Sequence, residues 1–364
     1  MLKPTAIRIG FLMVILCTSL LSQAQQTWLP REPSPAASVS QTVGISIIAV
    51  HYSRPSIRGR EVWGTLVPYG WDKNGSAIGL ESPWRAGANE NTVLHLSHTA
   101  TIEGNTVPAG DYGLFFLINK DNTGEVILSK DYKSWGAFWY NPKQDQMRAK
   151  ITIRDVPVST EKLYYSFDSV GRTAAELDLN WAKKQFPVKI EFAVDDIVME
   201  NARELLNGQT AFDFQNLNAA ANYALKYNTD TADAMKWVTR SLGANPQNYN
   251  ALVAKAGLIK KAGDSLAAAK IMKDAVASAN EGQLNAYGYQ LLGENKFSEA
   301  IDALKLNTQK HPESANAWDS LGEAYALSGD KKNAIVNFKK SLSLNPPPLV
   351  RANSEKYLKQ LGAM

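Results

Sequence analysis

Residues 315–346, ANAWDSLGEAYALSGDKKNAIVNFKKSLSLNP, decide the fold of the C-terminal half of this 364-residue chain. Aromatic, aliphatic and small residues recur in this stretch at fixed intervals: Trp318, Leu321, Gly322, Tyr325, Ala334, Phe338, Ser341 and Pro346. A similar set stands about 34 residues earlier: Leu284, Tyr287, Gly288, Leu291, Ala300, Leu304, Asn307 and Pro312. A weaker copy comprises Asn218, Ala221, Asn222, Leu225, Ala234, Val238, Ser241 and Pro246. Self-similarity at this period indicates stacked two-helix units.

These spacings resemble the signature of the tetratricopeptide repeat. The resemblance implies about four repeats over residues 211–347, with a linking helix at 197–210 before them and a capping helix at 348–364 after them. The second repeat, Asn248 to Asn280, is degenerate, because Pro246 and Pro312 are two residues closer than two periods. Small residues such as Gly288 and Gly322 would let paired helices approach closely. An unrelated helical bundle is the alternative.

Proteins of this repeat family resemble peptide- or protein-binding scaffolds, and the first helix of each pair lines their inner groove. The resemblance places seven residues in the groove here: Tyr223, Lys226, Asn285, Tyr289, Asn316, Asp319 and Glu323. They include no basic cluster that would clamp a carboxylate. For each of them, plain solvated surface is the alternative interpretation.

The first half of the chain alternates apolar and polar residues with period two. Strands are expected at about residues 38–43, 45–52, 92–96, 112–118, 125–128, 149–154, 175–181 and 188–194. One apolar and one polar face on each strand predict antiparallel sheets in a β-sandwich or barrel-like domain over residues 38–196. The period changes after Asp195-Asp196, so the domain boundary is expected near 196–210. The proline-rich residues 25–37 are predicted to be a flexible leader.

Several motifs within the β domain stand out from ordinary strand-and-turn sequence. They are Tyr52-Ser53-Arg54-Pro55, Gly59-Arg60, WGTLVPYG at 63–70, WRAGANE at 84–90, PAGDY at 108–112, Trp135-Gly136 and Tyr140. Their order resembles the bacterial domain of unknown function 2911 family, and the resemblance covers about residues 34–194. It implies an exported β domain, followed in some members by tetratricopeptide repeats, and it supplies no established activity. Residues 71–83 depart from the pattern as an insertion beside the motif.

Charged and aromatic residues of these motifs are the candidates for a ligand site: Arg54, Arg60, Trp63, Trp84, Arg85, Asn89 and Glu90. Guanidinium groups stack on indoles and pair with carboxylates, so a partly buried network of arginine and glutamate could bind an anionic small molecule or a glycan. The same network could instead tie irregular loops to the sheet, since buried loop backbone needs polar partners. Trp71, in the insertion, is the tryptophan most expected to expose its ring.

The N-terminus has the layout of a secretory signal peptide. Lys3 and Arg8 precede the apolar stretch from Ile9 to Leu21, and Ser22-Gln23-Ala24 follows as a cleavage site. Cleavage after Ala24 would remove the single cysteine, Cys17, and leave no membrane span; an uncleaved anchor is the alternative. The expected location is therefore the periplasm or the outside of the cell.

Composition and motifs narrow the chemistry. A net charge of +4, from 39 basic and 35 acidic residues, is too small to indicate a nucleic-acid partner. His95 and His98 should point to opposite faces of a strand, and no metal, cofactor or catalytic motif is recognised. The sequence favours a non-catalytic binding or scaffold protein of the cell envelope, with a protein partner on the repeats and a ligand or second protein on the β domain. The alternative is a hydrolase of envelope polysaccharide that uses the repeats for docking; Asp111, Asp131 and Glu90 are its candidate carboxylates, but their spacing selects no pair.

Overall fold

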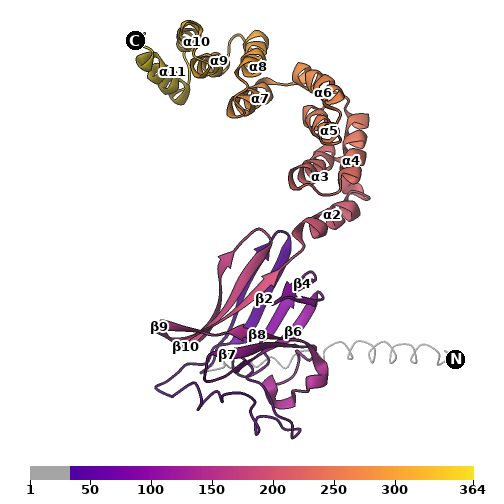
Figure 1. Ribbon diagram of the computed structural model, residues 1–364, viewed down its shortest axis with the longest axis vertical. Helices are drawn as coiled ribbons and strands as arrows, with labels where there is room; N and C mark the ends of the chain where they lie inside the picture. Colours follow the sequence, from indigo (N-terminus) through magenta and orange to yellow (C-terminus); the bar gives the residue numbers. More distant parts are fainter. Residues whose placement is uncertain (1–32) are drawn as a thin grey trace, which may run out of the picture. The chain divides into compact units, whose positions relative to one another are not determined.

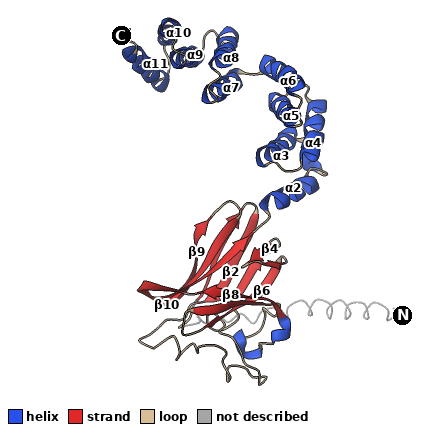
Figure 2. Ribbon diagram, in the orientation of Figure 1, coloured by secondary structure: helices blue, strands red, loops and turns tan. Residues whose placement is uncertain are grey.

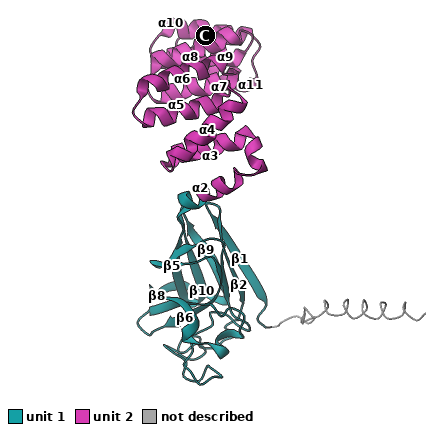
Figure 3. Ribbon diagram, turned by 90° about the vertical axis from the view of Figure 1, so that its right-hand side faces the viewer, with its two compact units in different colours: residues 1–197 teal, residues 198–364 magenta. Residues whose placement is uncertain are grey.

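The computed structural model of the chain describes residues 33–364, so the expected signal peptide lies outside the described residues. The chain divides into two compact units after Ile197 (Figure 3). The first unit is built of strands and the second of helices (Figure 2). Among the described residues, the first strand begins at Ala36, inside the expected leader, and the expected linking helix begins at Val194, three residues earlier than expected.

Two antiparallel sheets make up the first unit, and they do not close into a barrel (Figure 1). The six-stranded sheet has the order β1-β2-β3-β6-β7-β8, and the four-stranded sheet has the order β5-β4-β10-β9. The strands are β1 (Ala36–Val43), β2 (Ser46–Ser53), β3 (Val93–Leu96), β4 (Ala100–Ile102), β5 (Asn105–Val107), β6 (Gly110–Ile118), β7 (Thr123–Ser129), β8 (Asp145–Thr152), β9 (Arg154–Val170) and β10 (Ala174–Glu191). The expected sandwich class is confirmed.

The alternation read from the sequence accounts for most of the core. Ile48 and Val50 of β2 are fully buried, while the intervening Ala49 is partly open to solvent. Leu177 and Leu179 of β10 are buried as expected, but Asp178 between them is buried as well. Burying its apolar face stabilises an alternating strand, and only one register places that whole face in the core.

Strands β6 and β7 do not have the polar outer face that was expected. Phe115, Leu117 and Ile127 are buried on the side opposite the sandwich core, in a second cluster with Ala137 and Tyr140. The 3-10 turn at Gly136–Trp139 supplies Ala137, and Trp71 packs on the cluster. A cover on the outer face explains why these two strands read as continuous apolar runs.

The two long strands of the smaller sheet also differ from expectation. The strands expected at 175–181 and 188–194 are one strand, β10, with register shifts on either side of Ala182, whose φ is +51°. Its partner β9 was not expected as a strand, because the residues at its start are mostly exposed and include Pro157. Irregular pairing of this kind bends a strand without ending it.

Ten helices form the second unit together with the end of the first: α2 (Val194–Leu205), α3 (Phe214–Tyr227), α4 (Thr231–Ala244), α5 (Tyr249–Lys261), α6 (Ser265–Ser278), α7 (Glu281–Gly293), α8 (Phe297–Lys310), α9 (Ala315–Leu327), α10 (Lys331–Ser343) and α11 (Pro348–Gln360). Four antiparallel pairs, α3/α4 to α9/α10, are followed by α11. The expected helical-repeat solenoid is confirmed, and the degenerate second repeat still forms the pair α5/α6. Capping side chains such as Asp230, Asn280 and Ser314 begin the helices by accepting backbone N–H bonds.

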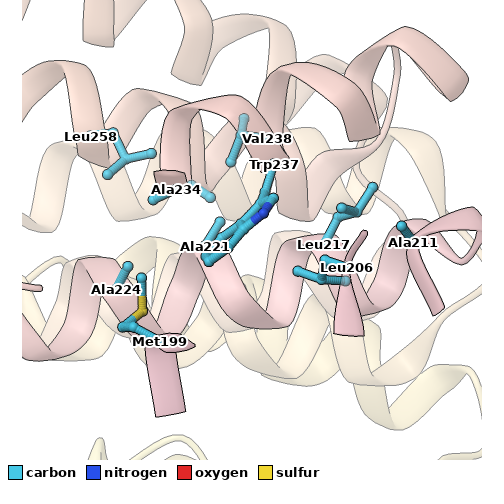
Figure 4. Packing of buried hydrophobic residues seen from close by; sticks show 11 residues of the cluster. Met199, Leu206, Ala211, Leu217, Ala221, Ala224, Ala234, Trp237, Val238 and Leu258 are labelled. Carbon is cyan, nitrogen blue, oxygen red and sulfur yellow. The ribbon is translucent and has the colours of Figure 1, made fainter. Parts of the chain in front are cut away.

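Small residues bring the two helices of a pair together, as the spacing predicted. A Cβ added to Gly288 of α7 would lie 2.6 Å from Cγ of Leu304 on α8. A Cβ added to Gly322 of α9 would lie 2.9 Å from the ring of Phe338 on α10. At the other end of the unit, Met199 and Trp237 belong to a buried cluster with residues of α3, α4 and α5 (Figure 4). Each pair therefore buries its apolar face against its neighbours. No helix within residues 33–364 is long and apolar enough to cross a membrane.

Candidate functional site

The WRAGANE motif leaves the six-stranded sheet and returns to it. Trp84 and Phe116 of β6 exchange two backbone hydrogen bonds of 3.0 Å. Two residues back along β6, the N–H of Leu114 donates to the carbonyl of Thr92 at 2.8 Å. Residues 85–91 therefore form a loop that is anchored at both ends to one strand.

The loop is held in a tight conformation. Ala86 and Asn89 have φ of +53° and +62°, a backbone region that residues other than glycine rarely adopt. The carbonyl of Ala86 accepts hydrogen bonds from the hydroxyls of Thr92 at 3.1 Å and Tyr165 at 2.9 Å. Tyr165 lies on β9, so the loop is fixed to both sheets. Backbone of this strained kind persists only where the surroundings determine it.

Arg85 is the charged group at the centre of the loop. Its Nη1 donates to the carbonyl of Asn89 at 2.8 Å. A Cβ on Gly136 would lie 2.6 Å from Cζ, Nε and Nη1 of Arg85, so the guanidinium lies flat against that glycine. Burial lowers the pKa of Arg85 from its ordinary value.

The other two arginines of the motif also bond to backbone carbonyls. Arg54 donates from Nε to the carbonyl of Leu163 at 2.9 Å. Arg60 donates to the carbonyls of Ile57 at 2.9 Å and Ser56 at 2.6 Å. The carbonyl that Arg54 bonds lies in β9, and the two carbonyls that Arg60 bonds lie in the irregular segment after β2.

Four aromatic rings from distant parts of the first unit pack together beside the loop. Trp84 stacks on Trp181 with the ring centroids 5.9 Å apart and 14° between the planes. Trp63 meets both rings edge-on and lies 5.4 Å from Phe186. The indole N–H of Trp63 is buried and has no hydrogen-bond partner in the part of the chain that the structure describes.

A cavity of about 400 Å³ opens beside these groups. Four of the seven expected ligand-site residues line it: Arg60, Trp84, Arg85 and Asn89. The other three lie outside the lining: Trp63 packs behind Trp84, Arg54 bonds to β9, and Glu90 is half-buried in the loop. Lining residues that the sequence did not single out include Arg58, Asp72, Ser82 and Trp181. The volume is at the lower end of the range for small-molecule sites, about 300–1,000 Å³.

Trp71 is not the exposed ring of the β unit. It is half-buried, its ring lies 6.0 Å from that of Tyr140, and the guanidinium of Arg148 sits 4.9 Å over it. Trp135 and Trp139 are the exposed rings, with about half of each residue open to solvent. The insertion thus folds back onto the sheet, because its tryptophan has an apolar cluster to cover.

The histidines and the expected carboxylates have separate local partners. Nδ1 of His95 lies 2.7 Å from Oδ1 of Asp111, and Nδ1 of His98 lies 2.9 Å from the hydroxyl of Ser97. Asp131 accepts a hydrogen bond from Ser134. Over residues 33–364, no group of three histidine, cysteine or acidic side chains is placed to hold a metal ion.

Hydrogen bonds join equivalent positions on the first helices of consecutive repeats in the second unit, among them several of the expected groove residues. The hydroxyl of Tyr289 on α7 donates to Oε2 of Glu323 on α9 at 2.9 Å. The hydroxyl of Tyr357 on α11 donates to Oε1 of the same glutamate at 3.1 Å. Each step spans 34 residues, which is one repeat. Glu323 is thus held between two tyrosines.

A second rung lies one turn earlier on the same helices. Asn353 donates to Oδ2 of Asp319 at 2.8 Å, and Ser354 donates to Oδ1. Burial raises the pKa of Asp319, since its side chain is almost fully enclosed. Burial and the nearby Glu323 carboxylate raise the pKa of Tyr357 to about 12. The two rungs place the carboxylates of Asp319 and Glu323 one turn apart on α9, and the ammonium group of Lys356 lies 5.7 Å from the ring centroid of Tyr357.

The remaining groove candidates are spread over three helices. Asn285 on α7 and Asn316 on α9 are half-buried, and the buried Oδ1 of Asn285 has no partner among the described residues. Tyr223 packs against Tyr227 on α3 at 4.6 Å, and Lys226 lies over that ring. This first pair therefore presents a different surface from the last one.

Helix α11 contributes to the groove, although the sequence indicated only a cap. Asn353 and Tyr357 stand 34 residues after Asp319 and Glu323, so continuing the repeat period past Pro346 would have found them. The signal was weak because α11 lacks the large and small residues of the repeat signature.

Comparison with known families supports the division into two units. Residues 34–190 match the family described as "Protein of unknown function (DUF2911)". The resemblance expected from the motifs is thus confirmed for the first unit. No curated protein matches the chain.

Solved structures resemble the helical part. A structure described as the functional characterisation of pilF from Pseudomonas aeruginosa is 22% identical, covering 46% of this chain and 70% of its own, with a TM-score of 0.28. The crystal structure of MamA is 17% identical, covering 42% and 89%, with a TM-score of 0.29. The protein YrrB, described as "a TPR protein with an unusual peptide-binding site", is 16% identical, covering 44% and 84%, with a TM-score of 0.28.

Proposed function

We propose that this chain is an exported binding protein of the bacterial cell envelope. Its repeats hold a segment of a protein partner in their groove, and its β unit holds a small ligand in the cavity beside Arg85. Export is proposed from the expected signal peptide and its Ser22-Gln23-Ala24 site. Protein binding is supported by the solenoid, because stacked repeats form extended concave surfaces that suit this purpose.

The observation that carries the proposal is the position of Glu323 in the last repeats. Tyr289 and Tyr357 fix its carboxylate from both sides, so the charge is held in place before any partner arrives. Preorganised groups lose little conformational entropy on binding. The Glu323 carboxylate, on a half-buried side chain, favours a partner segment that carries lysine, arginine or a free amino group.

Capture of partners from an envelope extract tests this function. The mature chain is immobilised as wild type, as Glu323→Gln and as Val336→Lys, and retained proteins are identified by mass spectrometry. Glu323→Gln removes the charge; its Oε1 can accept from one tyrosine hydroxyl, and its Nε2 can donate to the other. Val336 is exposed on α10, the second helix of the pair, and serves as the control. We expect one set of proteins to be retained by wild type and control and lost with Glu323→Gln. Equal retention by all three proteins would contradict a groove partner.

Export is tested separately. Intact-mass measurement of the chain recovered from the envelope fraction should give a protein that begins at Gln25. A recovered chain that still carries residues 1–24 would contradict the cleavage.

A further inference from the structure

Positive charge predominates in the lining of the β-unit cavity. Arg58, Arg60 and Arg85 contribute three guanidinium groups, and Asp72 contributes one carboxylate. Part of the Asp72 charge is already engaged, since its Oδ1 accepts the N–H of Asn74 at 2.9 Å. A partly closed space with this balance of charge favours an anionic ligand.

Arg85 is built to take a planar anion. One of its terminal nitrogens is bonded to the Asn89 carbonyl, and its face is covered by Gly136. Within residues 33–364, that carbonyl is the hydrogen-bond partner that the structure gives Arg85, which leaves Nε and Nη2 to donate together. Two parallel N–H donors on one edge of a guanidinium match the two oxygens of a carboxylate.

The rest of the lining indicates what carries the carboxylate. Ser34, Ser56 and Ser82 supply hydroxyl groups, and Trp84 supplies an indole. Asn89 supplies an amide, whose Nδ2 already donates to the carbonyl of Ser34 at 3.2 Å. Most small-molecule cavities are lined mainly by apolar side chains. A lining rich in hydrogen-bonding groups around an aromatic ring suits a polyhydroxylated ring better than a lipid or an aromatic compound.

We propose that the cavity binds a sugar acid, a saccharide ring that bears a carboxylate. Arg85 takes the carboxylate through Nε and Nη2, the serine and asparagine side chains bond to the ring hydroxyls, and Trp84 packs on the ring. This inference rests on the proposal that the β unit holds a small ligand, and it is independent of the partner on the repeats.

The test compares probes that differ in one group. D-Glucuronate, D-glucose and inorganic phosphate are titrated against the full mature chain at matched ionic strength. Two readouts are followed, the tryptophan fluorescence and the melting temperature; Trp84 and Trp181 both line the cavity and report on its occupation. The variants are Arg85→Gln, Arg58→Gln and, as a control, Arg172→Gln, whose side chain pairs with Asp195 away from the cavity.

We expect glucuronate to change the fluorescence and raise the melting temperature, and glucose and phosphate to do neither. Arg85→Gln should weaken glucuronate binding at least about tenfold, which is the loss of a charge-assisted hydrogen bond. Arg58→Gln should weaken it less, and Arg172→Gln should leave it unchanged. Arg58 is exposed, so its variant still tests the charge requirement if Arg85→Gln fails to fold.

Three results would overturn the inference. If glucose binds as well as glucuronate, the cavity holds a saccharide but the carboxylate is not recognised. If phosphate binds as well, the site takes any small anion. If glucuronate has no effect, or the same effect on Arg85→Gln as on wild type, the assignment of Arg85 fails. The capture experiment with Glu323→Gln is unaffected by any of these outcomes, so failure here is distinguishable from failure of the proposed partner binding.

Discussion

Asp178 is a buried acid that no described residue hydrogen-bonds, and neutralising it should stabilise the first unit. It lies on β10 with 1% of its surface exposed, and neither carboxylate oxygen has a hydrogen-bond partner among the described residues. Burial and the carboxylates of Glu176 and Asp168 raise its pKa to about 7, and Arg154 offsets this only in part. The perturbation is Asp178→Asn, which keeps the shape of the side chain and removes the charge.

The magnitude follows from linkage between protonation and folding. The folded-state pKa is about 7, above the ordinary value of 3.8, so the folded chain binds the proton more tightly than the unfolded chain. The contribution of Asp178 to the free energy of unfolding is therefore fully present below about pH 4, where the group is protonated in both states. That contribution is lost as the pH rises through 7 and the folded chain must ionise the buried acid. The gap of roughly three pH units, at about 1.4 kcal/mol each, gives a loss of up to about 4 kcal/mol above pH 7. Asp178→Asn should recover much of it.

Urea unfolding followed by tryptophan fluorescence measures this effect, because most of the tryptophans lie in the first unit. The free energy of unfolding is compared between wild type and Asp178→Asn from below pH 4 to above pH 7. The difference should be small at the acid end and grow to a few kcal/mol at the alkaline end. Asp168→Asn, at an exposed position, should give a much smaller difference. If the Asp178→Asn difference does not change with pH, the raised pKa is refuted.

Three further substitutions test the second unit by thermal or urea unfolding followed by circular dichroism at the helical band. Gly288→Ala should destabilise the second unit by about 1–3 kcal/mol, because the new methyl group would overlap the buried Leu304. Gly293→Ala lies at the end of the same helix, where a new methyl group meets nothing within 4 Å, and should stabilise the unit by up to about 1 kcal/mol. Equal effects of the two glycine substitutions would contradict the close packing. Asp230→Ala should lower the free energy of unfolding by about 1 kcal/mol, because Asp230 caps α4 and also pairs with Arg203. An unchanged unfolding midpoint would show that the cap does not stabilise the helix.

The sequence by itself determined the class of both units and the repeat period of the second. Each repeat folds from contacts that are local or one period away, so a 34-residue spacing is enough to place Tyr289 and Glu323 at equivalent positions on the first helices of consecutive repeats. The alternation of the β strands likewise depends on neighbouring residues, and it located most of β1, β2, β6, β7 and β10. It missed β9, whose exposed residues leave no apolar stripe to read.

Only the tertiary structure decided which motif residues share a cavity. Arg54 and Arg85 belong to the same sequence motifs, yet Arg54 bonds to a strand 109 residues away while Arg85 lines the cavity. Trp181, which the alternation assigned to the core, reaches the same cavity beside Trp84. Contacts between residues this far apart in the chain depend on how two sheets and their loops pack, and no short-range pattern in a sequence encodes that packing.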